Sequence, residues 1–557
     1  MMKKILLFLF LCYSFSLVAQ VTNDGEPVSW ELTNSISINA ISLPKVDIKK
    51  LRIEDDINVK TQIKPFRIGV QHDVNVGLKN AGTWTQLPNG DKIWRVLFNS
   101  KDAVHLSVVF DNFYIPKGGK VYLYNDDKTD LIGAYTEALN NKEKVLGTWF
   151  VKGDKLWIEY YEPKEVVNQG KLNLSTVIHG YRLGHTYQKG YLNVTEEKAL
   201  NDSGDCNQDV DCPIGLDFES HKNVLKRSVA FLNMGNGFIC SGALVNNTAQ
   251  DKKPYFLTAN HCFTDDEGTA SNPASYSFRF KWISRDPVCA AITNSTDGPT
   301  NFTMNGSTLR ARNPNTDFML VEINNAIPAG WDLTYAGWDK SDTNPTFEVG
   351  IHHPSGDIMK VCRDDTGATK QVNNGAVTWE VTSAGGGWEL GVTEGGSSGS
   401  PLFDQNGRLI GQLFGGGAAC SGTIDNGAFD FYGRFGISWD AGGFASNQLK
   451  DWLDPQNLNQ NTLNTLENVL AINDEFLEKN ITLFPNPTTG ILQINATGLV
   501  GNLSFEVYNM LGQNIKSGKL LNNKTLNLNE LTSSIYFIKI VEIDTNRSLV
   551  KKIVLNK

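Results

Sequence analysis

Short runs of alternating apolar and polar residues dominate the first third of the chain. Examples are KIWRVLF (Lys92 to Phe98), VHLSVVF (Val104 to Phe110) and KVYLYN (Lys120 to Asn125), and turn residues separate them. Alternation with a period of two is typical of half-buried β-strands. We therefore predict a small β-rich domain over residues 20–198.

A second domain begins where cysteine and glycine become frequent. DCNQDVDCP carries the first cysteines after Cys12, and short strand-like runs separated by Gly, Asn and Pro continue to about residue 456. Helical periodicity is visible only near the end, in NQLKDWL (Asn447 to Leu453). The pattern predicts an all-β barrel or sandwich over residues 199–456, closed by one C-terminal helix.

The rest of the chain divides into a linker and a third domain. Residues 457–480 are rich in Asn and Leu without a core pattern, and we interpret them as a linker. Residues 481–557 contain GILQINA, LSFEVYNMLG, SIYFIKIVEI and SLVKKIVLNK between turns, which predicts a small β-sandwich. A multi-domain organisation agrees with the length of 557 residues, which is too long for one hydrophobic core.

The N-terminus has the layout of a secretory signal peptide. Lys3 and Lys4 precede a short apolar run that ends in small residues at Val18 and Ala19, so we assign residues 1–19 to the signal. No later segment is apolar for long enough to span a bilayer. We expect a soluble protein outside the cytoplasm that keeps its disulfides.

The net charge of the chain argues against one class of partner. The formal net charge of -9 is modest for this length and spread along the sequence, so no basic face is available to neutralise phosphates. We expect no nucleic-acid partner.

The strongest local signal for chemistry is GVTEGGSSGSPLF, from Gly391 to Phe403. A serine nucleophile needs a tight Gly-rich turn that exposes its hydroxyl and points backbone N–H groups at the oxyanion of a tetrahedral intermediate. In this turn Ser398 is the candidate nucleophile, and the amides of Gly396 and Ser398 are the candidate oxyanion hole. The alternative is a plain Gly/Ser surface loop.

A serine hydroxyl also needs a base, and the second domain has four histidines to supply it. His261 lies in PYFLTANHCF, directly after an apolar strand and next to Cys262, where a disulfide could hold the backbone. We predict that His261 is the base, against the alternative of a structural histidine. The adjacent pair His352 and His353 has no HExxH-type spacing, and consecutive residues of a strand point to opposite faces. We therefore expect no zinc site, and a structural or cleft-rim role for that pair.

The third member of a triad is a partly buried carboxylate that holds the imidazole in the correct tautomer. Asp317, in NTDFMLVEI, stands just before an apolar run that is typical of a core strand. His261, Asp317 and Ser398 follow one another in the order of the chymotrypsin arrangement. We select Asp317 by this order along the chain, because an acidic residue before a strand is common and indicates little by itself.

Taken together, the motifs of the second domain resemble the lysyl endopeptidases, bacterial relatives of trypsin. The similarity covers roughly Asn201 to Asp454 and includes CNQDVDCP, CSGALVNN, YFLTANHC, TDFMLVEINN, YAGWD, IHHPSGD, GVTEGGSSGSP, GQLFGG, YGRFGISW and LKDWLDP. The resemblance implies a chymotrypsin-like double β-barrel, the triad named above and cleavage after lysine. It also implies a precursor whose N-terminal region is removed, and self-processing after Lys198 fits cleavage at lysine.

The same resemblance implies a set of disulfides that spacing alone leaves open among 15 pairings of six cysteines. The implied bridges are Cys206–Cys420, Cys212–Cys289 and Cys240–Cys262. Cys12 leaves with the signal peptide, and we interpret the remaining Cys362 as a buried thiol.

Specificity for a cationic side chain requires a buried anion. Trypsin has an aspartate six residues before its serine, but that position is Val392 in this chain. The lysyl endopeptidases use an aspartate in a motif like DxYGR, and Asp430 in FDFYGRF matches it. We predict that Asp430 receives the cation and that Glu394 adds negative potential to the same pocket.

Two positions depart from the family pattern. The family has a histidine in the motif after the nucleophile, where this chain has Phe414 in GQLFGG. Its active-site tryptophan has only Trp379 and Trp388 as candidate counterparts.

The C-terminal segment resembles the sorting domain recognised by the type IX secretion system, through LFPNPTTG, VYNMLGQ and IVLNK. This resemblance implies export across an outer membrane by that machinery, followed by release or attachment at the cell surface. The alternative is an accessory domain that binds carbohydrate or protein, but residues 481–557 contain no Trp for an aromatic platform.

The sequence therefore predicts a secreted serine endopeptidase that acts on proteins or peptides, without metal or cofactor, as a monomer. One alternative is trypsin-like cleavage after both Lys and Arg. Another is a catalytically inactive protease-fold binding protein of the cell surface. For the N-terminal domain we predict an inhibitory or folding-assisting pro-region.

Overall fold

We describe the protein from a computed structural model. The structure describes residues 25–32, 37–61, 64–183, 200–264, 268–381, 386–467, 475–496, 503–509, 514–520, 525–542 and 548–557. The chain forms two compact units, Met1–Glu467 and Asn468–Lys557. Each unit is described by itself below.

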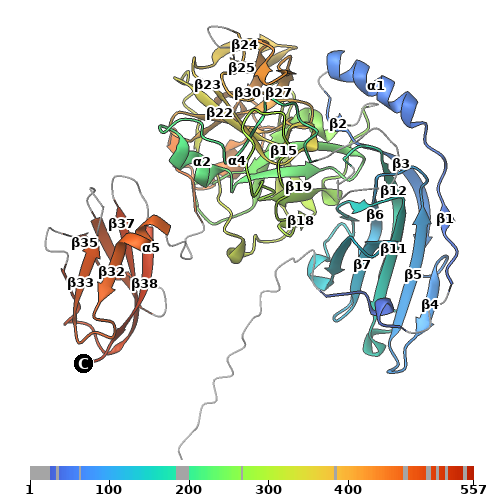
Figure 1. Cartoon of the computed structure of the whole chain (residues 1–557), viewed down its shortest axis with the longest axis horizontal. Coiled ribbons are helices and arrows are strands. Elements are labelled where there is room, and N and C mark those ends of the chain that lie inside the picture. The colour runs from blue at the N-terminus through green and yellow to red at the C-terminus, as the bar shows by residue number, and fades with distance from the viewer. Residues whose placement is uncertain are drawn as a thin grey trace, which may run out of the picture. The chain divides into compact units, whose positions relative to one another are not determined.

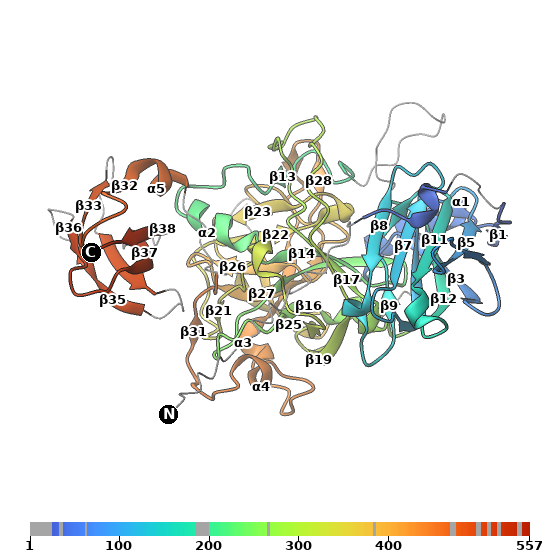
Figure 2. The same ribbon diagram turned by 90° about the horizontal axis from the view of Figure 1, so that it is seen from below.

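The N-terminal domain of the first unit is a sandwich of two sheets, which appear as two layers in Figure 2. The first sheet contains β1 (Ile41–Ser42), β4 (Thr83–Gln86), β5 (Lys92–Asn99), β7 (Lys120–Asn125), β8 (Leu131–Tyr135) and β11 (Lys155–Glu162). The second contains β3 (Gly69–Gly77), β6 (His105–Tyr114), β9 (Leu146–Gly147), β10 (Val151–Lys152) and β12 (Lys171–Gly180). Its helical segments are α1 (Ile48–Thr61) and the short 3-10 turns η1 (Val28–Trp30), η2 (Glu137–Leu139) and η3 (Lys164–Val166).

Two further sheets build the second domain of this unit. One contains β14 (Val229–Asn233), β15 (Phe238–Leu244), β16 (Tyr255–Ala259), β17 (Ser277–Phe280), β18 (Thr303–Asn305), β19 (Ser307–Asn313) and β20 (Phe318–Ile323), joined by β2 (Phe66–Arg67) from the N-terminal domain. The other contains β13 (Gln208–Asp209), β21 (Trp338–Asp339), β22 (Glu348–His352), β23 (Lys360–Asp364), β24 (Thr369–Asn373), β25 (Ala376–Val381), β26 (Pro401–Asp404), β27 (Leu409–Gly416), β30 (Asp430–Arg434) and β31 (Thr462–Leu463). Their strands pair antiparallel almost throughout, and Figure 1 shows this domain in green to orange.

The smaller elements of the second domain connect and cover these sheets. They are α2 (Glu219–Leu225), α3 (Phe435–Ser438), α4 (Lys450–Leu453), η4 (Asn260–Phe263), η5 (Pro273–Ser275), η6 (Ala329–Trp331), η7 (Pro354–Gly356) and the hairpin of β28 (Cys420–Ser421) and β29 (Ile424–Asp425).

The strand that leads to the candidate base is buried on both faces. In β16, Tyr255 and Leu257 belong to one hydrophobic cluster, whereas Phe256 belongs to another. Because successive side chains of a strand point to opposite faces, both sides of β16 are packed. The turn that follows β16 is therefore anchored at its start.

The N-terminal domain packs directly on the second domain. Trp149 meets Phe231 edge-on with the ring centroids 5.3 Å apart, and the guanidinium of Arg279 lies 4.0 Å from the centre of the Trp149 ring. The side-chain amide of Asn233 donates to the Thr148 carbonyl at 3.2 Å. One hydrophobic cluster includes residues of both domains, so burial couples them.

The second unit is a small β-sandwich with its own core. Its sheets contain β32 (Ile481–Phe484), β33 (Ile491–Ala496) and β36 (Thr525–Asn527) on one side, and β34 (Leu503–Tyr508), β35 (Asn514–Leu520), β37 (Ser534–Glu542) and β38 (Ser548–Leu555) on the other. Alternating residues such as Ile538 and Ile540 of β37 are fully buried in the core between them.

The predicted mostly-β fold class is confirmed in all three parts. Two details differ from expectation. The stretch that we interpreted as a linker contributes β31, which pairs with β21, and α5 (Glu475–Asn480). The helix expected in NQLKDWL is only the four-residue α4. The expected signal peptide and the processing position Lys198 lie outside the described residues. Among those residues, no helix combines the length and the apolar character that crossing a membrane requires.

Candidate active site

His261 and Asp317 meet because β16 and β20 are neighbours. The register pairs Ala259 with Phe318, so Asp317, directly before Phe318, lies beside the residues that follow Ala259. The backbone N–H of His261 donates to Asp317 Oδ1 at 2.8 Å, and His261 Nδ1 lies 2.7 Å from Asp317 Oδ2. Two contacts to one carboxylate fix the orientation of the imidazole ring.

Asp317 is built for this task by its surroundings. Only 2 % of the residue is exposed, and burial raises the pKa of its carboxyl above the ordinary value, while the contacts with His261 act in the opposite direction. Its φ of 53° lies in the left-handed region, which Asp tolerates better than most residues. The conformation turns the carboxylate from the end of a β-hairpin toward η4.

The second nitrogen of His261 is available on the side of the serine turn. Within the described part of the chain, the buried Nε2 atom has no hydrogen-bond partner. The Ser398 turn is adjacent, because a Cβ added to Gly399 would lie 2.1 Å from Thr258 Oγ1 and 2.6 Å from the Ala259 nitrogen. Hydrogen bonds between a nucleophile and its base are often long before substrate binds, so the missing bond does not argue against the pair.

The turn itself is strained in the way that glycine permits. Gly396 has a φ of 94° and Gly399 a φ of 80°, both disfavoured for residues with a Cβ. Ser397 N donates to the Glu394 carbonyl at 3.0 Å. In the part of the chain that the structure describes, the amides of Gly396 and Ser398 donate no hydrogen bond. Two amides of this kind could receive an oxyanion.

Two side chains that the sequence did not reveal brace this turn from behind. Ser241 Oγ donates to the Gly396 carbonyl at 3.0 Å, while its own backbone N–H donates to the Ser398 carbonyl at 2.8 Å. The Ser397 hydroxyl lies 2.7 Å from Nδ1 of His352. Burial lowers the pKa of His352 to about 3, so this imidazole is neutral at physiological pH.

The neighbouring histidine is also structural. His353 is fully buried and stacks on Phe231 and Trp282, with ring centroids 5.5 Å and 6.1 Å away. Its Nδ1 lies 2.9 Å from the Asp357 carbonyl, and burial lowers the pKa of the ring to about 4. His352 and His353 thus point into different surroundings, with His352 the last residue of β22 and His353 directly before η7.

Asp430 is a buried carboxylate at the start of β30. Oδ2 accepts hydrogen bonds from Trp388 Nε1 and Thr393 Oγ1, both at 2.8 Å, and Oδ1 accepts one from the Ala418 amide at 3.3 Å. Burial raises its pKa to about 6, and the hydrogen bonds act in the opposite direction. A Cβ on Gly416 would lie 2.0 Å from Oδ1, so glycine is required beside this carboxylate.

Glu394 is held by partners of its own. Its carboxylate accepts from the Gly204 amide at 3.0 Å and from the Ser355 hydroxyl at 2.9 Å. Burial raises its pKa, again against the effect of these hydrogen bonds. The structure therefore places Glu394 where it ties the start of the domain to the serine turn, without a direct hydrogen bond to Asp430.

The aromatic positions that depart from the family pattern can be placed as well. The Phe414 ring lies against His261 with the centroids 6.1 Å apart. Trp388 binds Asp430 as described, whereas Trp379 is a core residue whose Nε1 donates to the Ile410 carbonyl at 3.0 Å. Phe414 is thus the aromatic neighbour of the imidazole.

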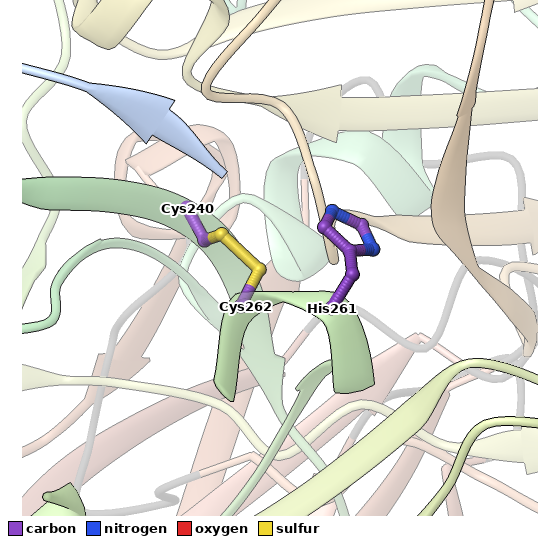
Figure 3. Close-up of side chains that lie close together, drawn as sticks. All are labelled: Cys240, His261 and Cys262. Carbon is purple, nitrogen blue, oxygen red and sulfur yellow. A yellow bond between two sulfur atoms is a disulfide. The ribbon is translucent and has the colours of Figure 1, made fainter. Parts of the chain in front are cut away.

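The three disulfides are Cys206–Cys420, Cys212–Cys289 and Cys240–Cys262. Figure 3 shows the last of them beside His261. Cys240, His261 and Cys262 bring possible metal-binding atoms close together, but the disulfide between the two cysteines leaves no thiolate to bind a metal. Cys362 is a free and fully buried thiol whose pKa burial raises well above the ordinary value.

Comparisons with known proteins give matches to two families. Residues 200–433 match the family described as lysyl endopeptidase, C-terminal domain, and residues 482–556 match the secretion system C-terminal sorting domain. Residues 200–433 are therefore similar to the lysyl endopeptidase C-terminal domain, and residues 482–556 to the sorting domain. The sorting domain indicates export to the cell exterior.

A curated relative is the lysyl endopeptidase of Pseudomonas aeruginosa, 27% identical over 279 residues, which are 48% of this chain and 56% of that protein. The chain thus spans about half the length of the relative it matches.

Among solved structures, PorZ, a surface component of the type-IX secretion system of Porphyromonas gingivalis, matches at 8% identity with a TM-score of 0.13, over 57% of this chain and 37% of that one. The BSP domain of a biofilm associated protein matches at 8% identity with a TM-score of 0.13, over 88% and 82%. Scores this low carry no argument about either protein.

Proposed function

We propose that this protein is a secreted serine endopeptidase with a triad of His261, Asp317 and Ser398. The observation that carries the proposal is the state of the His261 ring. Nδ1 is held 2.7 Å from the buried Asp317 carboxylate, and Nε2 is left without a hydrogen-bond partner among the described residues, next to the serine turn. An imidazole that is oriented at Nδ1 and unpaired at Nε2 is arranged to act as a general base.

In the proposed reaction Ser398 Oγ attacks the carbonyl carbon of the scissile bond while His261 Nε2 takes its proton. The amides of Gly396 and Ser398 stabilise the oxyanion. His261 then gives the proton to the leaving amine, and water hydrolyses the acyl-enzyme by the reverse use of the same groups. Asp317 keeps Nδ1 protonated and stabilises the imidazolium as it forms.

We assign specificity for lysine to Asp430. The carboxylate is held by Trp388 and Thr393, and Thr393 is five residues before the nucleophile, so a cationic side chain bound there extends from the serine turn. The carboxyl of Glu394 is already bound by neighbouring groups, so it contributes through its charge rather than by direct contact. Cleavage after both Lys and Arg is the alternative within the same mechanism.

The remaining parts of the proposal concern the whole chain. The sorting domain delivers the protein to the type IX machinery, and the mature enzyme acts as a monomer on proteins or peptides. We also propose that the N-terminal domain is removed by cleavage after Lys198. N-terminal sequencing of the mature form tests this step, and a start at another residue contradicts it.

The deciding experiment compares matched peptides that carry Lys, Arg or Phe before the scissile bond. We expect the matured wild-type enzyme to cleave after Lys and Ser398→Ala to be slower by about 10⁶. Equal cleavage after Arg would keep the mechanism and replace the lysine assignment. Absence of any Ser398-dependent cleavage would favour the inactive binding protein.

A further inference from the structure

Three buried carboxyl groups lie in a row across three strands of the second domain. The register pairs Glu348 of β22 with Asp364 of β23 on one side and with Asp404 of β26 on the other. Figure 1 labels β22 and β23 in this domain. Glu348 and Asp364 are fully buried, and Asp404 is 4 % exposed. Because directly paired residues of neighbouring strands point to the same face of a sheet, the three carboxyl groups share one buried face.

Asp404 receives its hydrogen-bond donors from the turn that follows it. Oδ1 accepts from Asn406 N at 3.0 Å and from Arg408 N at 2.8 Å, and Oδ2 accepts from Asn406 Nδ2 at 3.2 Å. Both oxygens of Asp404 are thus satisfied without any contribution from Glu348.

Glu348 and Asp364 each keep one oxygen without a donor. Glu348 Oε2 accepts from Ala368 N at 3.0 Å, and Asp364 Oδ1 accepts from Thr366 N at 2.8 Å and Thr366 Oγ1 at 2.7 Å. Glu348 Oε1 and Asp364 Oδ2 are buried and accept no hydrogen bond from any described residue. The two carboxyl groups are within hydrogen-bonding contact of each other. A proton on one of them would therefore supply the donor that the other lacks.

The described residues supply no counter-charge for this pair. Arg363 follows the next position of β23 to the other face, where Nε lies 2.6 Å from Asp365 Oδ1 and Nη1 2.8 Å from Asp217 Oδ1. The titratable groups that face the pair are Cys362 of β23, Asp404 of β26, Tyr432 of β30 and Glu389 of the segment before the serine turn. None of these four groups is a cation in either protonation state.

Two facing carboxyl groups without a cation hold one proton between them, because two negative charges repel strongly in a buried site. Burial raises the pKa of Glu348 well above its ordinary value, and the charge of Asp364 acts in the same direction. Asp364 accepts two hydrogen bonds from Thr366, whereas Glu348 accepts one from Ala368. The negative charge is therefore better stabilised on Asp364, and the proton on Glu348.

The end of β23 beside this pair also binds the segment that leads to the serine turn. Arg363 N donates to the Leu390 carbonyl at 2.8 Å, and Glu389 N donates to the Arg363 carbonyl at 3.0 Å. Asp365 N donates to Glu389 Oε2 at 2.8 Å. Burial raises the pKa of Glu389, and the charge of Asp364 acts in the same direction. Glu389 is thus electrostatically coupled to the pair and bound to the same strand end.

This segment also carries a partner of Asp430. Trp388 stands directly before Glu389, and its Nε1 donates to Asp430 Oδ2 at 2.8 Å. A second negative charge, on Glu348, would repel Asp364 and Glu389 and loosen the segment from the end of β23. The protonation state of Glu348 therefore reaches Asp430 through a short series of direct contacts.

We propose that Glu348 and Asp364 share one proton at neutral pH, and that this carboxyl pair keeps residues 388–390 bound to the end of β23 until alkaline pH removes the proton. On deprotonation the proton passes to the solvent, the O–H···O hydrogen bond is lost and two carboxylates face each other. The shared proton is independent of the proposed function. Only the effect of the pair on lysine recognition rests on that function.

The first test measures the stability of the full-length chain in a Ser398→Ala background, which prevents self-digestion. Tryptophan fluorescence follows urea unfolding of the first unit, because residues 468–557 contain no Trp. In this background, Glu348→Gln gives Asp364 an amide N–H donor and needs no proton.

The expected result follows from the number of protons bound in each state. With the native pair, the folded chain keeps a proton that an unfolded glutamate releases above its ordinary pKa of 4.5, so stability falls as the pH rises. Glu348→Gln does not share this loss. Between about pH 5 and about pH 7, the unfolding equilibrium constant of the native pair should rise about tenfold per pH unit relative to that of the variant.

Glu380→Gln on β25 is the matched control, because it removes a half-buried carboxyl group from the same sheet. It is expected to leave the pH dependence of the native pair unchanged. A difference between Glu348→Gln and the native pair that does not vary with pH would overturn the shared proton. A rise in the unfolding midpoint with added calcium that Glu348→Gln abolishes would also overturn it, since a cation would then lie between the two carboxylates.

Infrared spectroscopy of the same Ser398→Ala chain at neutral pH detects the proton directly. We expect Glu348→Gln to remove the C=O band of one protonated carboxyl group. Asp364→Asn is the second variant: it gives Glu348 an N–H donor, so Glu348 ionises and the same band disappears. A native chain without this band, or a band that persists in both variants, contradicts the proposal.

The last test concerns lysine recognition by the matured enzyme. KM for one lysyl peptide is measured with the native pair and with Glu348→Gln from neutral to alkaline pH. The titrations of Asp430 and of the peptide cancel in the ratio of the two KM values. We expect this ratio of native pair to variant to be near one at neutral pH and to rise severalfold at alkaline pH, with the kcat ratio unchanged. A KM ratio that is constant with pH would refute the effect of the pair on residues 388–390.

The failures of the two proposals are distinguishable. Absence of Ser398-dependent cleavage refutes the peptidase, but the infrared and unfolding measurements on the Ser398→Ala chain still decide the shared proton. A missing carboxyl band refutes the shared proton and leaves the peptidase intact.

Discussion

The buried carboxylate of Asp430 predicts a pH dependence of specificity that is separate from the pH dependence of catalysis. Burial raises its pKa from 3.8 to about 6, so the group is ionised above about pH 6 and neutral below it. Only the ionised form attracts a lysine ammonium. Recognition of lysine should therefore weaken as the pH falls through 6.

The size of the effect follows from the same value. The rise in pKa corresponds to about 3 kcal/mol of cost for holding the charge in this environment. A free carboxyl with a pKa near 6 is about nine-tenths ionised at pH 7 and about one-tenth ionised at pH 5. The lysine-dependent part of kcat/KM should thus fall about tenfold over this range.

The assay measures kcat/KM for two peptides that differ only in the residue before the cut, lysine or its uncharged isostere norleucine. Because both peptides need the same catalytic groups, the pH dependence of catalysis cancels in the ratio, and the ratio reports Asp430. We expect the ratio to fall about tenfold from pH 7 to pH 5 in the wild type and to be flat and low in Asp430→Asn. A pH-independent preference for lysine in the wild type would refute the assignment of Asp430.

Three other predictions concern the site and its support. Asp317→Asn should lower kcat about 10⁴-fold with little change in KM, because the amide favours the wrong tautomer of His261. Steady-state kinetics on a lysyl peptide measure this change. A loss of kcat below tenfold would contradict the role of Asp317 in orienting His261. Replacing Cys240 and Cys262 together by Ser should lower the free energy of unfolding by about 3 kcal/mol. Denaturant titration measures this in a Ser398→Ala background, which avoids self-digestion. An unchanged unfolding midpoint would argue against a stabilising bridge. His352→Ala removes the buried partner of the Ser397 hydroxyl, so kcat should fall by a factor that is about 10 to 100 times larger than the factor by which KM rises. Equal changes in kcat and KM would point to a general loss of folded enzyme.

The candidate triad could be predicted because its residue types stand in informative local contexts. Ser398 is marked by glycines that a tight turn requires, and His261 follows an apolar strand next to a cysteine. For Asp317 only its order in the chain was available. The structure adds the two contacts between its carboxylate and His261, which depend on the pairing of β16 with β20.

The supporting residues could not be found in this way. Ser241 reaches the Gly396 carbonyl across 155 positions of the chain, and His352 reaches Ser397 across 45. An isolated serine or histidine in a strand carries no signal of such a partner. Glu394 has equally distant partners, because its hydrogen bonds go to Gly204 and Ser355, which the sequence did not indicate.

The sequence by itself determined that this protein is built from β-strands in several domains, and it indicated the candidate nucleophile turn and the residue types of a candidate triad. Both conclusions rest on local patterns, namely side-chain alternation every two residues and the need for glycine where φ is positive. The tertiary structure decided which distant groups meet: the orientation of His261 by Asp317, the bracing of the serine turn, and the docking of β2 along β15. These contacts follow from strand pairing and burial over long separations in the chain, and a pattern of a few neighbouring residues does not contain that information.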